Sequence, residues 1–327
     1  TPSASLVDYG TKFAVEVLSA GSSEVHVFEG EVRIKPTFAP PQTDTVRLLS
    51  NQATRVRGTS GIPEGIDIDH SRFVRQLKEP TLANAAYYDF IDSLNPVMMF
   101  RMAPSEDGST LDSHGSHEVN GIINAEAMTS PPFKSGKVGS SLHFDGPQAP
   151  AFASVADYKP TTNGELTVCA WVRADSRPRW AAVAKHWAIE FPGGLPPYQG
   201  TGGQFHFGLH EDAGDLELQV RDCEGGVIKL REHKPLPIGD WQHVGFVVGE
   251  GKARLFRNGK EVASADCIGL ATDGPSGMGI GAKLNPECTE PDGRNPGFWH
   301  GRIDELSVFH RALSNDELAR LFDYAND

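Results

Sequence analysis

The sequence predicts an all-β protein with one short helix. Short runs rich in Val, Phe, Thr and Leu alternate with Gly, Pro, Asn and Asp roughly every eight to twelve residues, a spacing typical of strands joined by turns. Turn residues are abundant, since 35 glycines and 23 prolines stand among 327 residues. A helical apolar period is clear only near the C-terminus. These observations predict strands almost throughout and a many-stranded sandwich for the longest stretch.

The segment 1–60 is expected to form a small β domain. A turn at 21–23 separates its first two alternating runs, and a proline-rich break at 36–41 precedes the last one. Beyond Gly58 the alternation dissolves, which places the end of the domain near residue 60. The strand-like runs are 13–17, 25–28, 32–34 and 46–56.

Residues 61–92 are expected to be a linker that packs on its neighbour. They mix polar and apolar residues without strand alternation, and Phe73, Leu77 and Leu82 suggest at most a short helix interrupted by Pro80. From residue 93 to 327 the strand rhythm returns. That length exceeds a minimal immunoglobulin sandwich and suits a many-stranded jelly roll.

The one convincing helix lies at the C-terminus. Ser314 followed by Glu317 has the spacing of a capping box, in which each residue hydrogen-bonds the other's backbone. Leu318, Leu321 and Phe322 then fall on one face of the helix. This stretch should therefore pack as an amphipathic helix.

The charge balance argues against nucleic acid and anionic membranes as partners. There are 43 acidic and 30 basic residues, a net charge of −13, and no run of Lys or Arg that could neutralise phosphates. No apolar stretch approaches the ~18–20 residues that span a bilayer. The chain starts at Thr1 without a leader-like segment, so we expect any signal or membrane anchor to have been removed or to lie upstream.

Four segments of the long domain resemble the laminin-G-like, concanavalin-type jelly roll. Asn258-Gly259 within the third is also a strong hairpin signal. The resemblance extends over most of the long domain and implies a two-sheet sandwich that binds a ligand outside the cytoplasm. The segments are 136–146, 166–173, 240–244 with 256–260, and 301–306 with 311–314.

The segment 1–60 resembles the latter part of a FecR-type domain, the periplasmic regulator module of iron-dicitrate signalling systems. The matching segments are 1–15, 25–32 and 48–53. The resemblance implies that this domain is N-terminally incomplete. Its pairing with a laminin-G-like jelly roll is similar to envelope proteins of planctomycete-type bacteria, which implies a periplasmic, cell-envelope or extracellular location and an upstream anchor.

A concanavalin-type sandwich can be a glycanase, but the sequence offers no pair of carboxylates suited to glycoside hydrolysis. The run 290–292 reaches Asn295 where a second Glu would be needed, and its proline argues against a strand. Asp304 and Glu305 would point to opposite faces of a strand. No G-x-S-x-G, H-E-x-x-H or phosphate-binding glycine loop is present. We therefore expect a non-catalytic protein.

Calcium is the cofactor that the resemblance suggests. Laminin-G-like jelly rolls often hold one Ca²⁺ between an early Asp loop and the Asp of the last strand, which implies Asp112 and Asp304 here, with Asp145 as a further candidate. The alternative is that these are turn-forming and surface acids. His206 and His210 would share a strand face, but without a third ligand they indicate a solvated face rather than a metal pair.

A long glycine- and proline-rich insertion at 191–203 separates two predicted strands. It contains Tyr198 and is flanked by Trp180, His186 and Trp187. Long loops in compact domains are commonly functional, and aromatic rings beside polar groups suit a sugar or a peptide. These four residues are therefore the candidate ligand-binding set, and the alternative is a variable loop whose rings pack on the rim.

The cysteines allow a disulfide but do not define one. Cys267 and Cys288 lie in loop-like segments, and an oxidising compartment would favour a bridge between them. Four cysteines permit three full connectivities, and Cys169 in an apolar run suits a buried thiol.

The sequence thus predicts a recognition or signalling protein whose jelly roll binds a glycan or an extracytoplasmic protein. The FecR-like part would act in signal regulation. Two alternatives stay open, a glycan-active enzyme of the concanavalin-like class and a structural scaffold without a ligand.

Overall fold

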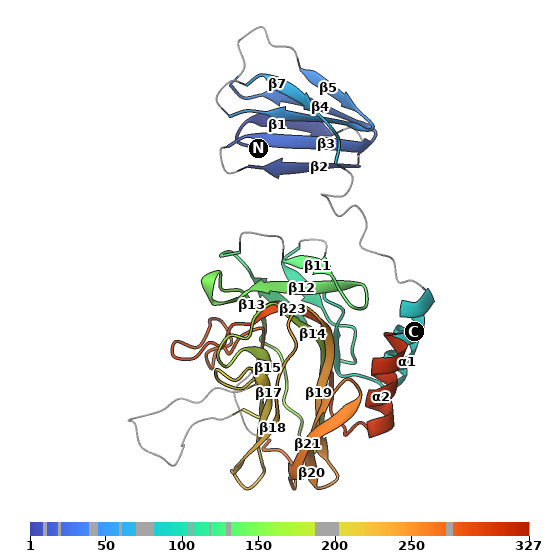
Figure 1. The fold of residues 1–327 in the computed structure, drawn as a ribbon, viewed down its shortest axis with the longest axis vertical. Coiled ribbons are helices and arrows are strands. Elements are labelled where there is room, and N and C mark those ends of the chain that lie inside the picture. The colour runs from blue at the N-terminus through green and yellow to red at the C-terminus, as the bar shows by residue number, and fades with distance from the viewer. Residues whose placement is uncertain are drawn as a thin grey trace. The chain divides into compact units, whose positions relative to one another are not determined.

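The computed structural model divides the chain into two compact units, residues 1–76 and 77–327 (Figure 1). Each unit is described by itself. The residues that the structure describes are 1–8, 12–18, 21–38, 45–58, 61–69, 82–103, 105, 108–117, 119–128, 132–186, 203–272 and 277–326.

The first unit consists of two open antiparallel sheets around a small core. Alternate residues such as Val25, Val27, Val32 and Ile34 are buried between them, because successive side chains of a strand point to opposite faces. One sheet has the order β1 (Ala4–Asp8), β4 (Glu31–Pro36), β5 (Val46–Leu49); the other has the order β2 (Lys12–Val17), β3 (Ser23–Glu29), β6 (Gln52–Val56), β7 (Pro63–Ile66).

The structure places the boundary between the units elsewhere than expected at residues 60 and 92. β7 extends the first unit, since Val56 pairs with Pro63 in an antiparallel ladder. Helix α1 (Leu82–Ser93) belongs to the second unit, where Tyr87 and Ile91 are buried. The expected linker therefore contributes an element to each unit.

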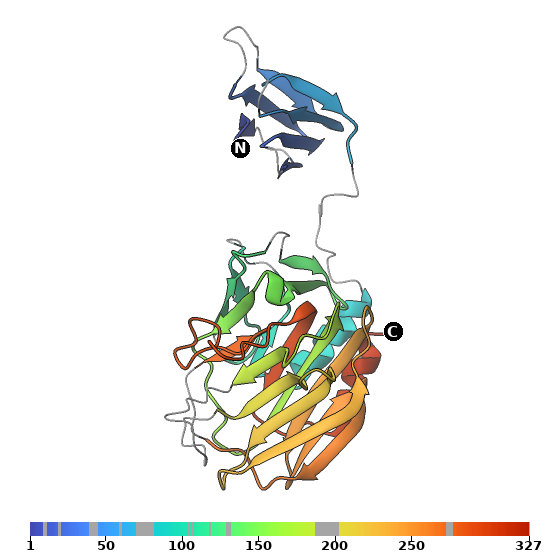
Figure 2. The ribbon, with the colours of Figure 1, turned by 60° about the vertical axis from the view of Figure 1, so that its left-hand side comes forward.

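The second unit is a sandwich of two eight-stranded antiparallel sheets (Figure 2), so the predicted all-β fold is confirmed. The first, which we call the β16 sheet, has the order β18 (Val227–Pro235), β17 (Asp215–Arg221), β16 (Phe205–Leu209), β15 (Ala182–His186), β22 (Met278–Ile280), β13 (Phe152–Val155), β10 (Asn120–Asn124), β9 (Thr110–Asp112). The second, which we call the β23 sheet, has the order β11 (Phe133–Ser135), β12 (Ser140–Asp145), β23 (His300–Phe309), β14 (Leu166–Ala174), β19 (Trp241–Gly249), β20 (Lys252–Arg257), β21 (Lys260–Asp266), and β8 (Met98–Phe100) also pairs with β23.

The main core fills the space between the two sheets. Phe205 and Phe207 of β16 meet Phe246 of β19 at ring-centroid distances of 5.2 and 5.3 Å. The hairpin signal is confirmed, because Asn258 and Gly259 connect β20 to β21 with positive φ angles of 51° and 73°. A short 3₁₀ helix, η1 (Gly146–Gln148), follows β12.

Two helices cover the outer face of the β23 sheet (Figure 1). α2 (Asn315–Tyr324) buries Leu318 and Leu321, and its Ser314 capping box is present. α1 is longer than the short helix expected from the sequence. Neither described helix is long and apolar enough to cross a membrane.

Candidate functional site

Three neighbouring strands of the β16 sheet bring polar side chains together on its outer face. Lys185 of β15 lies opposite His206 of β16, and His206 lies opposite Gln219 of β17. Residues directly opposite on antiparallel strands share a face. Phe205 and Phe207 point into the core, so His206 between them points outward. We call Lys185, His206 and Gln219 the polar row.

Buried carboxylates lie beside the polar row on β17. Glu217 accepts hydrogen bonds from the Gln219 amide and from Nδ1 of His210. The Asp215 carboxylate accepts hydrogen bonds from Nε and Nη2 of Arg231 at 2.8 and 3.0 Å. Burial would raise the pKa of Asp215, but the bonds from Arg231 hold it below its usual value. Both carboxylates are thus engaged within the protein.

Trp180 stands over the same face, and its backbone is held by a close contact. Its φ angle is +57°, a left-handed conformation that is costly for a bulky residue. A Cβ on Gly297 would lie 2.2 Å from the Trp180 carbonyl oxygen, so only glycine fits there. The half-buried indole meets the rings of His210 and His206 edge-on, at 5.3 and 6.1 Å. The ring is therefore preorganised beside the polar row.

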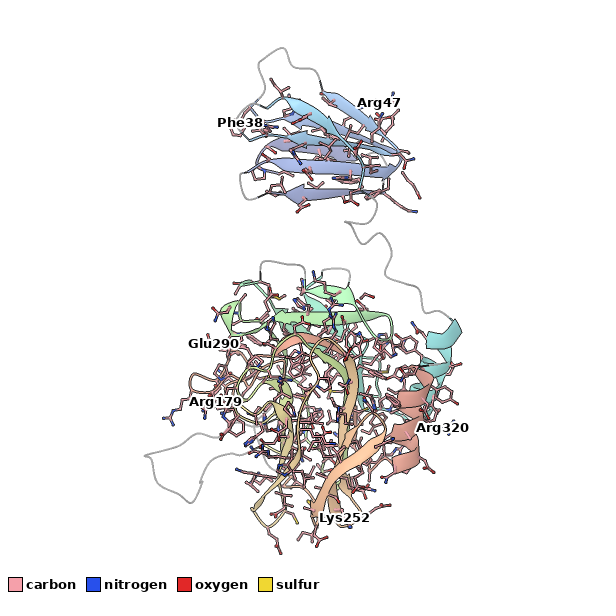
Figure 3. All side chains as sticks on the ribbon, in the orientation of Figure 1. Phe38, Arg47, Arg179, Lys252, Glu290 and Arg320 are labelled. Atoms are coloured by element: carbon pink, nitrogen blue, oxygen red, sulfur yellow. The ribbon has the colours of Figure 1, made fainter. Side chains whose placement is uncertain are left out.

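The loop 281–299 covers the neighbouring part of the face. A Cβ on Gly279 of β22 would lie 2.4 Å from the carbonyl oxygen of Ala282, which shows how closely the loop approaches the sheet. Lys283 of this loop forms an ion pair with Asp292 at 2.7 Å. Arg179 and Glu290 lie on the side of the sandwich away from Arg320 of α2 (Figure 3).

Two groups of the polar row lack partners. His206 is 2% exposed, and neither of its ring nitrogens has a hydrogen-bond partner among the residues that the structure describes. Burial lowers its pKa well below the usual value, and the charges of Lys185 and Lys283 add to this. Burial, with the Lys283 ammonium, also lowers the pKa of Lys185 to about 7. Such groups concentrate at binding and catalytic sites.

The four aromatic residues expected to bind a ligand separate in the structure. Trp180 lies at the site. His186 is fully buried on the core side, edge-on to Tyr158 at 5.0 Å, and its Nδ1 accepts the backbone N–H of Gln204. The strand alternation turns His186 inward, away from the face on which Trp180 lies, so the structure does not place it with Trp180. The two remaining candidates, Trp187 and Tyr198, lie outside the described residues.

The three expected calcium ligands lie apart. Asp112 is exposed at the end of β9 in the β16 sheet, whereas Asp304 is buried on β23 in the other sheet. Asp145 Oδ1 is hydrogen-bonded to His143 Nε2 at 2.9 Å. Within the described part of the chain, no three His, Cys, Asp or Glu side chains form a metal ligand set. Calcium binding stays a prediction that the residue positions do not support.

Asp304 and Glu305 form a buried acid pair on the helix-covered side of the β23 sheet. Asp304 Oδ2 accepts the backbone N–H groups of Lys137 and Val138 at 2.7 and 2.9 Å, and Glu305 Oε1 accepts the Tyr88 hydroxyl at 3.0 Å. The expectation of opposite faces is wrong. The ladder between β14 and β23 is irregular here and Glu305 has a φ of 51°, so a bulge turns both carboxylates the same way.

All four cysteines are free, so the expected bridge between Cys267 and Cys288 is not formed. Cys267 packs in the main core, and Cys288 packs in a separate small cluster with Phe152 and Leu284. Burial raises the pKa of the Cys169 thiol to about 12, which makes it unreactive as expected for a buried residue.

A separate polar hollow of about 470 Å³ lies where α1 ends. The Arg101–Asp92 ion pair at 3.4 Å stands in it, and His114 lines its other side. The Arg101 guanidinium lies over the Tyr88 ring at 4.1 Å. The charges of this hollow are thus paired within the protein, unlike those of the polar row.

Lys185, Glu217, Gln219 and Lys283 were not found from the sequence. Each stands at an outward position of a strand or in a loop, where a polar residue is ordinary. The one available signal was that Lys185 interrupts an otherwise apolar strand. Recognising the cluster required the register between β15, β16 and β17.

The geometry defines a jelly-roll sandwich with a candidate aromatic and polar site on the outer face of one sheet. The chain belongs to the concanavalin A-like lectin/glucanases superfamily, whose family model matches residues 149–319. That match runs from β13 into α2 and includes every residue of the site. It leaves the first unit outside, where the FecR-like resemblance stays a prediction.

Solved structures resemble the chain at low sequence identity. Domain 4 of AbnA, an extracellular arabinanase from Geobacillus stearothermophilus solved with arabinotriose, is 18% identical with a TM-score of 0.48, covering 69% of this chain and 98% of that one. The binding domain of Paraclostridial Mosquitocidal Protein 1 is 15% identical with a TM-score of 0.47, covering 70% and 52%. The botulinum neurotoxin serotype D binding domain is 11% identical with a TM-score of 0.48, covering 70% and 51%. The chain thus spans about half of each toxin domain, and no curated protein matches its sequence significantly.

Proposed function

We propose that the second unit is a non-catalytic glycan-binding module whose site is the outer face of the β16 sheet beside Trp180. The observation that carries this is a half-buried indole on a left-handed backbone, next to the ring of His206, which has no hydrogen-bond partner among the described residues. Sugars offer an apolar C–H face together with hydroxyl groups. An aromatic plane beside polar groups that still need partners suits both features.

The family name covers glucanases as well as lectins, so hydrolysis is the second candidate. Asp215 and Glu217 lie on one strand and reach the same outer face, which is the kind of pair that glycoside hydrolysis needs. Both are engaged, however, by Arg231 or by His210. An acid whose pKa is lowered by an arginine is poorly suited to donate a proton, which supports binding over catalysis.

A glycan array followed by calorimetry tests the proposal. Trp180→Ala should lower the affinity for the bound glycan at least about tenfold, equivalent to about 1.4 kcal/mol. Phe38→Ala is the matched control, since it removes an aromatic ring, 59% exposed, from the first unit. Equal affinities of the Trp180 variant and the wild type would refute the site.

Two further measurements separate the alternatives. Release of reducing sugar from polysaccharides, lost in Glu217→Gln, would favour the enzyme over the binding module. An array on which no glycan binds would favour a ligand-free scaffold or a protein ligand.

For the first unit we propose a role in signal regulation at the cell envelope or in the periplasm. The support is the resemblance of 1–15, 25–32 and 48–53 to the FecR-type domain. Fractionation of cells that produce the natural protein tests the location. Recovery in the cytoplasmic fraction would contradict it.

A further inference from the structure

The polar row contains a lysine and a buried imidazole that have no partner among the described residues, whereas the acids beside it are engaged. The titratable groups around it are Lys185 of β15, His206 of β16, His210 after it, Glu217 of β17, and Lys283 and Asp292 of the loop 281–299. Both acids in this set are already engaged. Glu217 accepts from His210 and Gln219, and Asp292 accepts from Lys283 and from the backbone N–H groups of Arg294 and Asn295.

Lys185 and His206 are the groups left over. No acceptor among the described residues pairs with the Lys185 ammonium, and both ring nitrogens of His206 are buried without a partner. Leaving a buried polar group such as the His206 imidazole unsatisfied costs free energy. The two residues are direct neighbours across β15 and β16, so one ligand group can reach both.

We propose that the glycan bound beside Trp180 carries a carboxylate, as a uronic acid or another acidic sugar does, and that Lys185 and His206 hold it. The inference rests on the proposed glycan-binding function and names its ligand class. A carboxylate accepts from the lysine ammonium and from an imidazole N–H, and bonds that involve charged groups are about twice as strong as neutral ones. A neutral sugar hydroxyl would leave the ammonium without a counter-charge.

The proposal also gives the affinity a direction with pH. Burial and the Lys283 charge bring the pKa of free Lys185 to about 7, so the unliganded site loses its charge as the pH rises above 7. A bound carboxylate favours the protonated lysine and raises its pKa. Affinity for an acidic glycan should therefore fall between pH 7 and 9, by up to about tenfold per pH unit, with proton uptake on binding.

Calorimetry with paired probes tests the ligand class. The probes are oligomers of galacturonate, hyaluronan and alginate, each compared with its carboxyl-reduced form, in which CH₂OH replaces each carboxylate. At least one acidic probe should bind about 10–100-fold more tightly than its reduced form. Lys185→Met should abolish that preference. Lys229→Met is the matched control, since it removes an exposed lysine one strand further along the same row and should keep the preference.

The outcomes separate this inference from the proposed function. If the acidic and the reduced probes bind equally well and both depend on Trp180, recognition of a carboxylate is refuted and the proposed glycan binding stands. Binding of no sugar would overturn both. A preference that survives Lys185→Met would also overturn the assignment. Should that variant fold poorly by circular dichroism, His206→Gln provides the second test and should reduce the preference in the same direction.

Discussion

Replacing Glu305 with glutamine should make the second unit more resistant to alkaline pH. The Glu305 side chain is fully buried, its Oε1 accepts the Tyr88 hydroxyl at 3.0 Å and its Oε2 has no partner in the described part of the chain. Burial and the adjacent Asp304 carboxylate raise its pKa well above the usual value. The folded protein therefore retains a proton that the unfolded chain releases near pH ~4.3.

The magnitude follows from this difference in bound protons. The stabilisation is complete below the unfolded pKa and is lost as pH rises toward the folded pKa, with a slope of about 1.4 kcal/mol per pH unit. Between pH 5 and pH 8 the loss would reach at most about 4 kcal/mol. Glutamine has the shape of the protonated acid and cannot ionise, so Glu305→Gln should gain that amount over the wild type across this range.

Urea unfolding followed by tryptophan fluorescence measures the effect in the full chain, because all five tryptophans lie in the second unit. Glu261→Gln is the control, since it neutralises an exposed acid on a strand. Its unfolding free energy should parallel that of the wild type at every pH. A Glu305→Gln curve that also runs parallel to the wild type would show that Glu305 is ionised in the folded state, and the reasoning would be wrong.

Three other outcomes are expected. Burial lowers the pKa of His243 to about 4, so the unfolded chain takes up a proton below pH ~6.5 that the folded protein does not, and stability is lost as the pH falls from about 6.5 to about 4. His243→Gln should remove about 3 kcal/mol of that loss in urea titrations. Gly297→Ala should lower glycan affinity at least about tenfold by calorimetry, because its Cβ would displace the Trp180 carbonyl, and unchanged affinity would contradict the role of that backbone. If calcium binds as the family resemblance implies, the melting temperature should rise with Ca²⁺ and fall back with EDTA, and the melting temperature of Asp304→Ala should not change with Ca²⁺. A wild-type melting temperature that does not change with Ca²⁺ would contradict calcium binding.

The features predictable from sequence were those specified by neighbouring residues. Asn258-Gly259 and the Ser314 capping box depend on a few consecutive residues, and both are present. The bulge at Glu305 was not predictable, because a non-glycine residue with positive φ is imposed by the surrounding sheet. Helix α1 was underestimated, since packing of Tyr87 and Ile91 against the sandwich, rather than a strong local pattern, stabilises it.

In the candidate site, too, features set by neighbouring residues could be predicted, whereas features set by strand pairing could not. His206 was expected on a solvated strand face; it does point away from the core, but it is buried, so the expected solvation is wrong. Trp180 was recognised as an aromatic residue beside a long loop. The partnership of His206 with Lys185 was not accessible, because the long insertion separates them in the sequence and only the pairing of β15 with β16 brings them together. The placement of Asp112 and Asp304 in different sheets was not accessible for a related reason, since no local pattern assigns either strand to its sheet.

The position of β23 has a consequence for how the protein is made. This strand ends at Phe309, yet it lies inside its sheet between β12 and β14, and its Asp304 pairs with Trp171 from a distant part of the sequence. During synthesis β12 and β14 therefore emerge long before the strand that joins them, with their edges open to other chains. Folding of the sandwich must wait until β23 has left the ribosome, and nascent chains stalled before His300 should be the ones that require a chaperone.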